Sequence, residues 1–299
     1  MGSSRSWVLP ATGRLMLAKR PPFSLFQVQT GGGVYSSFTG EASGFFGQYG
    51  PMTASAAEIA RELEVVEAER QRRLASPALR EKVTALKAFQ QRRFSHTYAD
   101  LLQSPRYGAA ARYFLEELYG PEDFSARDAQ FARVAPTIAR LFPSDLAETV
   151  AILSALHALS ETLDSAMGEQ LADATIAPAD YVAAWQGVGR EAERNRQIDL
   201  TLAVAAQLDR ITRMPLLRNA LRLMRGPARA AGLAELQHTL ESGFDIFKAM
   251  KGAEEFIAII AARERALAEA LFAAGKRGTA GTAAMREALA ALPPDTGDD

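Results

Sequence analysis

The sequence feature that most constrains the fold is a helix end, a stop and a new helix start within residues 112–128. On a helix, side chains at i, i+1, i+4 and i+5 share one broad face, and apolar residues occupy all four positions: Phe114, Leu115, Leu118 and Tyr119. Gly120 and Pro121 then stop the helix. Ser125 and Asp128 have the spacing of a capping box, which starts a second helix. The stretch therefore predicts two helices joined at a fixed corner.

The same stretch carries a family resemblance. Residues 113–119 read YFLEELY and are followed by YGPEDF. They resemble the motif of the bacterial protein family named for its FFLEELY sequence, with Tyr113 in place of the first Phe. Residues 86–102 and 243–264 also look familial, so the resemblance covers roughly residues 53–272. That family has no established function, so the resemblance implies a shared fold without implying an activity.

From Met52 onward, apolar residues recur only at the spacing of a helix, and nothing in the sequence predicts a strand. Ala and Leu are abundant while β-branched residues are sparse, which also favours helix. Prolines and short loops divide the sequence into about eight helices, so the expected fold is a single compact, irregular α-bundle, with a globin-like arrangement as one option. The residues expected in its core are Phe114, Leu118, Phe131, Leu153, Phe244, Phe247, Phe256 and Ile260.

Prolines and caps also predict where helices begin and end. The expected helices include 77–103, a motif helix at 106–119, 126–142, the longest helix at 145–172, 191–212, and a final pair at 228–250 and 252–273. Pro136 is expected to kink or split the helix that contains it, and chain breaks are expected at Pro215 and at Gly226-Pro227.

The two ends of the chain differ from this domain. Residues 1–51 hold a single acid, Glu41, and a run of three glycines, which suit a disordered extension. Met52 precedes a capping box, so residues 1–51 are either outside the native protein or a targeting or interaction arm. The all-α domain is expected at 52–274, and a flexible tail with one marginal set of helical turns is expected at 275–299.

Composition excludes several classes of function. The net charge is −1, so no global field selects nucleic acid or a membrane surface, and nucleic-acid binding is not expected. The chain has no cysteine, which excludes disulfides, thiolate nucleophiles and cysteine zinc sites and fits a cytoplasmic protein. No apolar run approaches the roughly 18 residues of a membrane span. Signature motifs of nucleotide-binding proteins and hydrolases are missing as well. The expected function is a non-catalytic binding or interaction module.

The expected partner of such a module is a second copy of the chain or another protein. Alanine-rich faces at 109–111 and 261–262 permit close approach of helices, either within one subunit or between subunits. Self-association is therefore the first expectation.

Each of the three histidines has a carboxylate within helical reach. The pairs are His96 with Asp100, His157 with Glu161 and Asp164, and His238 with Glu235 and Glu241. Such pairs can orient an imidazole for proton transfer or metal binding, and they are also common as plain surface pairs. Glu235 and His238 match half of a di-iron carboxylate motif, but the second half is missing, so no metal site is expected.

An alternative function centres on His157, the histidine expected to face inward beside Leu153 and Leu156. The ordinary interpretation is a core histidine bonded to a carbonyl or to Glu161. The functional interpretation is a pocket between the long helix and the C-terminal pair for an apolar carboxylate, such as a tetrapyrrole or an acyl group, with His157 as its polar handle. If the protein acts on that ligand, His157 and Glu161 are the candidate acid and base. No other cofactor is expected.

Arginine is the other local anomaly, because six arginines and no acid lie between Arg210 and Arg229. Arg218, Arg222 and Arg225 share one helix face, and their planar guanidinium groups suit the carboxylates of a ligand. The alternative is that these arginines pair with acids from other helices, notably the Glu-rich segment 58–69.

Overall fold

The computed structural model describes residues 56–118, 125–141, 144–214, 216–275 and 279–294. Within these ranges the chain forms 12 α-helices and one π-helical segment and has no strand, which confirms the all-α prediction. The predictions for residues 1–51 and for the stop at Gly120-Pro121 concern residues outside the described ranges.

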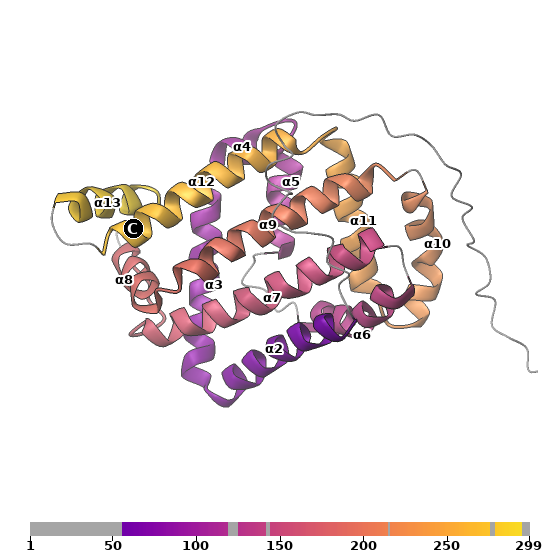
Figure 1. Cartoon of the computed structure of the whole chain (residues 1–299), viewed down its shortest axis with the longest axis horizontal. Helices are drawn as coiled ribbons and strands as arrows, with labels where there is room; N and C mark the ends of the chain where they lie inside the picture. Colours follow the sequence, from indigo (N-terminus) through magenta and orange to yellow (C-terminus); the bar gives the residue numbers. More distant parts are fainter. Residues whose placement is uncertain (1–55, 119–124, 142–143, 215, 276–278, 295–299) are drawn as a thin grey trace, which may run out of the picture. The chain divides into compact units, whose positions relative to one another are not determined.

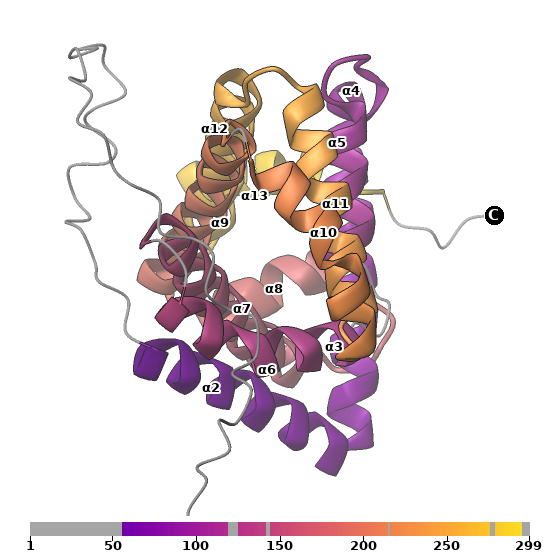
Figure 2. The same ribbon diagram turned by 90° about the vertical axis from the view of Figure 1, so that its right-hand side faces the viewer.

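Short connections join the helices (Figure 1). In chain order the elements are α2 (Ala56–Ala75), α3 (Pro77–Thr97), α4 (Ala99–Gln103), α5 (Gly108–Tyr113), the π-helical η1 (Phe114–Leu118), α6 (Ser125–Leu141), α7 (Ser144–Gln170), α8 (Pro178–Val188), α9 (Glu191–Thr212), α10 (Leu217–Ala230), α11 (Ala234–Ala249), α12 (Glu254–Ala273) and α13 (Thr279–Ala290). α7 packs against α2, α3, α6, α8 and α9, and it lies between α2 and α9 in Figure 1. Figure 2, turned by 90°, shows α9 beside α12.

Three expected helix boundaries differ from the structure. The helix expected at 77–103 is divided into α3 and α4 at Tyr98, whose φ of −116° and ψ of 25° leave the helical region. The break expected at Gly226-Pro227 is wrong, because α10 continues through Pro227. A proline removes one backbone hydrogen bond, and here the surrounding turn is exposed, so water can bond the carbonyl that is left over. The helix expected at 228–250 therefore begins only at Ala234. α6 likewise runs through Pro136 without being split.

The core consists of two main clusters of buried side chains. One gathers residues of α3, α7, α8, α12 and α13, and the other gathers residues of α3, α4, α5, η1, α9, α11 and α12. Five of the expected core residues are buried: Phe114, Phe244, Phe247, Phe256 and Ile260. Phe131 and Leu153 are only partly buried, and the side chain of Leu118 lies outside the described part. Most of the predicted core is thus confirmed.

The sequence motif forms the end of α5 and the π-helical turn that follows. An α-helix was expected over 106–119, but α5 ends at Tyr113 and η1 begins at Phe114. The hydroxyl of Tyr113 donates a hydrogen bond to the carbonyl of Thr239, 3.0 Å away in α11. It lies so close to Gly243 that a Cβ at that position would be 2.7 Å from the hydroxyl oxygen. The motif therefore fixes α5 closely against α11.

α7 differs from expectation in its apolar character. By length and composition, residues 145–170 could cross a membrane, with a mean hydropathy of 1.2, although no run of this kind was expected. This is weak evidence for a membrane span, because α7 contacts five other helices and carries the buried charged residues Glu161 and Asp164. Of the apolar window of α7, 33% is buried inside the described structure.

The region expected to be a tail contains α13. Ala284, Ala288 and Leu292 are buried against α8 and α12, so this helix is part of the packed core and is more than a marginal set of turns. Of the rest of that region, residues 276–278 and 295–299 lie outside the described ranges.

Candidate ligand-binding cavity

A cavity lies where the two core clusters meet. Residues of α3, α7, α8, α9 and α12 line it, together with Phe114 of η1, and the centres of water-sized molecules can occupy about 100 Å³ of it. A volume of about 10–15 Å³ on this measure holds one water, so the cavity is large enough for a small molecule. The cavity is the natural place to look for a ligand, because such sites are concave, mostly apolar and supplied with a few polar groups.

The residues that line the cavity extend along α9 and α12. One stripe of α9 faces it, at helical spacing: Arg194, Gln197, Ile198, Thr201, Leu202 and Ala205. The two helices are antiparallel, as shown by ion pairs of Arg265 with Asp199 at 3.0 Å and of Arg213 with Glu254 at 2.7 Å. At roughly 1.5 Å per residue, the stripe of α9 extends about 16 Å. The cavity, called the slot from here on, is therefore lined by α9 from near its start to beyond its middle.

Arg194 dominates the first end of this slot. A tight connection from α8 brings it there: Gly189 and Arg190 both have positive φ, 63° and 55°, and reverse the chain. As a result, the Arg194 guanidinium stacks 4.1 Å from the centre of the Trp185 ring. Its Nη1 donates a hydrogen bond to Gln197 at 3.0 Å, and Gln197 donates one to Ser160 at 2.9 Å.

The Arg194 side chain is unusual because it is a buried cation without a carboxylate partner among the described residues. The residue is 3% exposed, and Nη2 is buried with no hydrogen-bond partner in the described part of the chain. Burial lowers the pKa of the guanidinium from its ordinary value. A buried cation is costly unless it is paired, so the fold maintains an unfavourable charge at the wall of the slot.

A second arginine, Arg93 of α3, lines the slot nearby. It forms an ion pair with Glu264 of α12, and the hydroxyl of Tyr98 donates a second hydrogen bond to the same carboxylate at 2.7 Å. Burial alone would lower the pKa of Arg93, but the charge of Glu264 raises it above its ordinary value. This pair is thus internally neutral. The Nε of Arg93, however, is buried without a hydrogen-bond partner in the described residues.

Asp164 of α7 is the other acid at the slot. Its carboxylate accepts a hydrogen bond from Gln90 at 3.1 Å. Burial raises the pKa of Asp164. The charge of Glu161 also raises this pKa, whereas the charges of Lys87 and Arg194 lower it. No ion pair within 4.0 Å joins Asp164 to a cation among the described residues.

The polar atoms left without partners at the slot share one chemical type. All three are N–H donors: Arg93 Nε, Trp185 Nε1 and Arg194 Nη2. Buried donors in folded proteins are nearly always bonded, so such a group of donors calls for an acceptor. The other end of the slot needs no hydrogen-bond acceptor, because the residues that line it there are apolar: Phe94, Phe114, Leu202, Ala205 and Ile257. The slot thus fits a molecule with an acceptor head and an apolar body.

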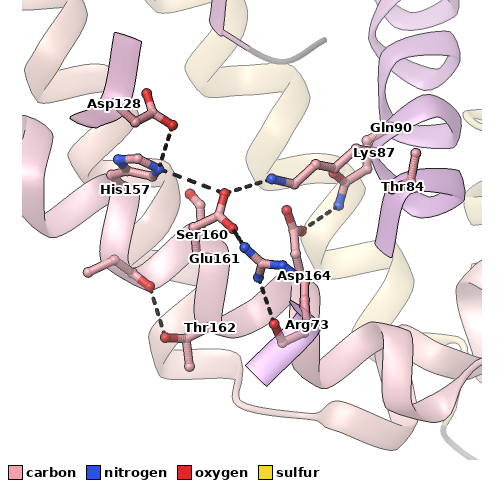
Figure 3. Close-up of polar contacts among 12 residues, drawn as sticks. Arg73, Thr84, Lys87, Gln90, Asp128, His157, Ser160, Glu161, Thr162 and Asp164 are labelled. Atoms are coloured by element: carbon pink, nitrogen blue, oxygen red, sulfur yellow. Dashed lines mark hydrogen bonds and ion pairs between the residues drawn. The ribbon is translucent and has the colours of Figure 1, made fainter. Parts of the chain in front are cut away.

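The residues proposed from sequence as an acid and a base form a separate network (Figure 3). Glu161 is buried and forms ion pairs with Arg73 of α2 and Lys87 of α3, the latter at 2.6 Å. Burial raises the pKa of Glu161, but Lys87 and Arg73 lower it overall to about 2. The Nε2 of His157 lies 3.8 Å from Glu161 and 3.6 Å from Asp128, beyond hydrogen-bond distance. Neither His157 nor Glu161 lines the slot.

The arginines of α10 also lie away from the slot and pair with acids. Arg218 forms ion pairs with Glu241 at 3.0 Å and with Asp245 at 2.6 Å, and Arg225 forms one with Glu241. Arg222 is exposed. The sequence left two interpretations of these arginines open, and the structure has Arg218 and Arg225 paired with acids of another helix instead of lining the slot. The acids come from α11 and not from segment 58–69.

The remaining sequence candidates are dispersed. His96, Glu235 and His238 are exposed. No group of three histidine, aspartate or glutamate side chains among the described residues could hold a metal ion. The slot does lie between α7 and α12, close to where a pocket was expected, but α11 contributes no lining residue.

Sequence reasoning missed Arg93, Trp185 and Arg194. For Arg194, the sequence does contain a signal. Arg194 and Gln197 are polar residues on the face of α9 that also carries the apolar Leu202 and Ala205. An arginine at such a position is either paired inside the protein or available to a ligand.

The fold and the slot define an all-α protein with an internal amphipathic cavity. A family model described as a domain of unknown function, DUF8198, matches residues 69–278, which is more than half of the chain, so the chain belongs to this family. No curated protein and no solved structure matches the sequence or the fold.

Proposed function

We propose that this protein is a non-catalytic binding protein whose slot takes a small carboxylate with an apolar body. The observation that carries the proposal is Arg194, a buried cation whose Nη2 lacks a partner in the described residues and which faces a cavity with an apolar far end. A ligand carboxylate would supply the missing counter-charge. Hydrogen bonds to charged groups are among the stronger ones, so this one contact would contribute much of the affinity.

The size of the slot supports an acyl-type ligand over a tetrapyrrole. An engineered protein cavity of roughly 150 Å³ holds a molecule of the size of benzene. The slot offers about 100 Å³ on the same type of measure. A macrocycle of four rings exceeds this space, whereas a small or narrow carboxylate fits it.

A catalytic role for His157 and Glu161 has less support. Glu161 is ionised and bound by two cations, so it is poorly suited to take up a proton near neutral pH. Both residues lie outside the slot lining, so a ligand there would not contact them. A cytoplasmic location belongs to the same proposal and rests on the cysteine-free sequence.

Trp185 provides the direct test, because its ring lines the slot and stacks on Arg194. The chain has 2 tryptophans, so a Trp7→Phe background leaves Trp185 as the only one. In that background, sodium propionate and sodium butyrate are titrated while tryptophan emission is recorded. Saturable quenching or a spectral shift in the micromolar to millimolar range is the expected result.

The matched variants are Arg194→Gln and Arg196→Gln. Arg196 lies on the same helix but is exposed and does not line the slot. Arg194→Gln should weaken binding by more than about tenfold, the loss expected for a hydrogen-bonded charge, and Arg196→Gln should leave it unchanged. The proposal fails if neither acid binds the parent protein, or if both variants bind as it does. The first of these results would indicate that Asp164 serves as the counter-charge of Arg194.

A second candidate function, protein–protein contact, has a specific observation of its own. Large apolar side chains are exposed at and around α10: Leu216, Leu223, Met224 and Leu240, with Leu223 79% exposed. Exposed apolar groups of this kind often mark association surfaces. The alanines at 110 and 111 are buried within the subunit and so do not contribute to such a contact. Light scattering at tens of micromolar should give a dimer or larger species that Leu223→Glu dissociates; a monomer would refute this candidate.

A further inference from the structure

We propose that the exposed apolar face of α10 binds α2 of a second copy of this chain, with the two helices antiparallel. In this contact Leu223 packs on Val65 of the partner subunit. Arg222 pairs with Glu64 of the partner subunit. Such a contact rests on the second candidate function, protein–protein contact, and does not involve the slot. It adds the identity of the partner, the surface that the partner uses and the direction of the two helices.

A stripe of apolar residues on α10 is exposed. Its members recur at alternating spacings of four and three residues, the pattern with which one helix packs along another: Leu216, Ala220, Leu223, Pro227 and Ala230. Leu223 is 79% exposed and Leu216 is 66% exposed. α10 packs against α9 and α11, and its buried residue Ala228 lies on another side of the helix. The stripe is therefore a second packing face, left open in the described part of the subunit.

Two arginines lie beside this stripe. Arg222 and Arg229 are exposed, and neither forms an ion pair or a hydrogen bond with a described residue. Each directly precedes a residue of the stripe, so its side chain is turned by about 100° from it. The other arginines of α10, Arg218 and Arg225, are held by acids of α11. A partner that covers the stripe and carries acids on this flank would therefore complement α10 in charge.

The arginines disfavour a contact between α10 and α10 of a second copy. A two-fold axis between two antiparallel helices keeps equivalent residues on the same side of the contact. Arg222 would then lie beside Arg222 of the partner subunit. Like charges placed close together oppose association. The partner surface of α10 therefore belongs to a different, acidic helix.

α2 has an exposed surface of this kind. Between residues 57 and 68, its exposed charged side chains are three glutamates and one arginine: Glu58, Glu64, Glu67 and Arg61. Val65 is 41% exposed among them, and the exposed Ala68 follows three residues later. Glu64 forms no ion pair or hydrogen bond with a described residue. α2 thus combines a small apolar centre with an acidic surround.

The order of residues in the two helices suits antiparallel packing. Arg222 directly precedes Leu223, and Glu64 directly precedes Val65. Each charged side chain is therefore turned by about 100°, in the same sense, from its apolar neighbour. When antiparallel helices meet at Leu223 and Val65, the two charged side chains lie on the same side of the contact. The arrangement that places like charges together in a pair of α10 helices thus places opposite charges together in a pair of α10 and α2.

The same alignment brings small residues together. Ala220 lies three residues before Leu223 in α10. Ala68 lies three residues after Val65 in α2, so the two alanines meet in the antiparallel pair. The distance between packed helices depends on the side chains at the contact, and two alanines permit a close approach. The contact therefore has an apolar centre that is small enough to close and a charged flank that specifies the partner.

The two faces belong to different parts of one subunit. α2 packs against α3, α6 and α7, whereas α10 packs against α9 and α11. The contact joins two unlike surfaces, and each copy carries one of each. Two copies that are each defective in a different face therefore still have one intact α10 face and one intact α2 face between them. This property separates the proposed contact from a pairing of like surfaces.

The experiment measures the mass of the full-length protein by sedimentation velocity at tens of micromolar, for two variants alone and mixed in equal amounts. Leu223→Glu disrupts the face on α10, and Val65→Glu disrupts the face on α2. Each variant alone should be a monomer. The mixture should form a dimer and no larger species, because one intact contact joins one copy of each variant.

Leu74→Glu is the matched control for the face on α2. Leu74 is 53% exposed on the same helix, and its nine-residue separation from Val65 places it on the opposite side, about 180° away. This variant should associate as the parent protein does. Arg222→Glu should weaken self-association by about fivefold, which is the upper range for an exposed ion pair. The double variant Arg222→Glu/Glu64→Arg should restore most of this loss, because it exchanges the two charges.

The possible outcomes separate the contact from the function on which it rests. If the parent protein is a monomer, the second candidate function itself fails. If the parent protein associates but the mixed variants stay monomeric, or if Val65→Glu associates as the parent does, only the contact with α2 is refuted. A monomeric parent protein that sediments with vesicles of phosphatidylcholine and phosphatidylserine would assign the face of α10 to a lipid surface instead.

Discussion

Replacing Glu161 by glutamine should cost about 3 kcal/mol of unfolding free energy at pH 7, because its buried carboxylate is the common partner of Arg73 and Lys87. Burial raises the pKa of this carboxyl, but Lys87 and Arg73 lower it overall from 4.5 to about 2. That difference of about 2.5 corresponds to roughly 3.4 kcal/mol, at about 1.36 kcal/mol for each pKa unit. Glutamine has a similar size but leaves both cations without their carboxylate.

The direction of the pKa change determines how the stabilisation by Glu161 depends on pH. A carboxyl group with a lowered folded-state pKa stabilises the fold fully above its unfolded pKa, near 4.5, and loses this contribution as the pH falls toward 2. The difference in unfolding free energy between the parent protein and Glu161→Gln should shrink from about 3.4 kcal/mol at pH 7 to about 1.4 kcal/mol at pH 3. Urea unfolding of both proteins at the two pH values measures it.

Glu148→Gln is the matched control on the same helix. Glu148 pairs with Arg210 at 3.3 Å, and its side chain is 38% exposed, so the pair is solvated. The change should cost less than about 1 kcal/mol at either pH. Two results would refute the assignment of Glu161 as a buried, doubly paired carboxylate. One is a loss of unfolding free energy below about 1 kcal/mol for Glu161→Gln at pH 7. The other is a loss that is equal at pH 7 and pH 3.

Three further predictions concern stability. Arg194→Met should raise the unfolding free energy by about 1–3 kcal/mol in the absence of ligand, because it replaces a buried cation with an apolar side chain of similar length. The same change should abolish carboxylate binding. A variant that is less stable than the parent protein in urea would contradict this prediction. Phe114→Ala should cost roughly 3–5 kcal/mol as a truncation of a buried ring, and a loss below about 1 kcal/mol in denaturant melts would show that the ring is not part of the core. Gly168→Ala should cost about 1–3 kcal/mol, since its Cβ would lie 2.7 Å from Val83 Cγ2. Gly226→Ala, which meets no atom within 4 Å in α10, should instead gain about 0.5–1 kcal/mol, and thermal melts of the two glycine variants should shift in opposite directions.

The sequence predicts the helices well, because the signals that set them are local. Pro77 follows its cap at Ser76, whose side chain accepts a hydrogen bond from the backbone N–H of Leu79, and α3 begins where expected. The long helix and 191–212 are also found at their expected places. The breaks are predicted less well, since whether a proline ends a helix depends on its surroundings. Pro227 lies in an exposed turn, and α10 continues through it.

The candidate site is harder to predict, because it depends on burial. His157 and the arginines of α10 stand out in sequence through their composition, yet they lie outside the slot. Arg194 lies in a charged run, RNR after REAE, that is typical of a solvated helix start. Its burial follows from the reversal at Gly189 and Arg190, which places Trp185 over it. No periodicity within α9 contains that information.

The π-helical turn at 114–118 makes the number of residues in the motif as important as their chemistry. Each α-helical residue turns the chain by about 100°. If one residue were deleted from this turn, the segment could close as an ordinary α-helix, and side chains within the turn itself would change phase relative to α5. Phe114 and Leu115 could then no longer both keep their present directions. A one-residue deletion here should therefore be more damaging than a conservative exchange at any single motif position, because it changes the angular positions of Phe114 and Leu115 relative to α5.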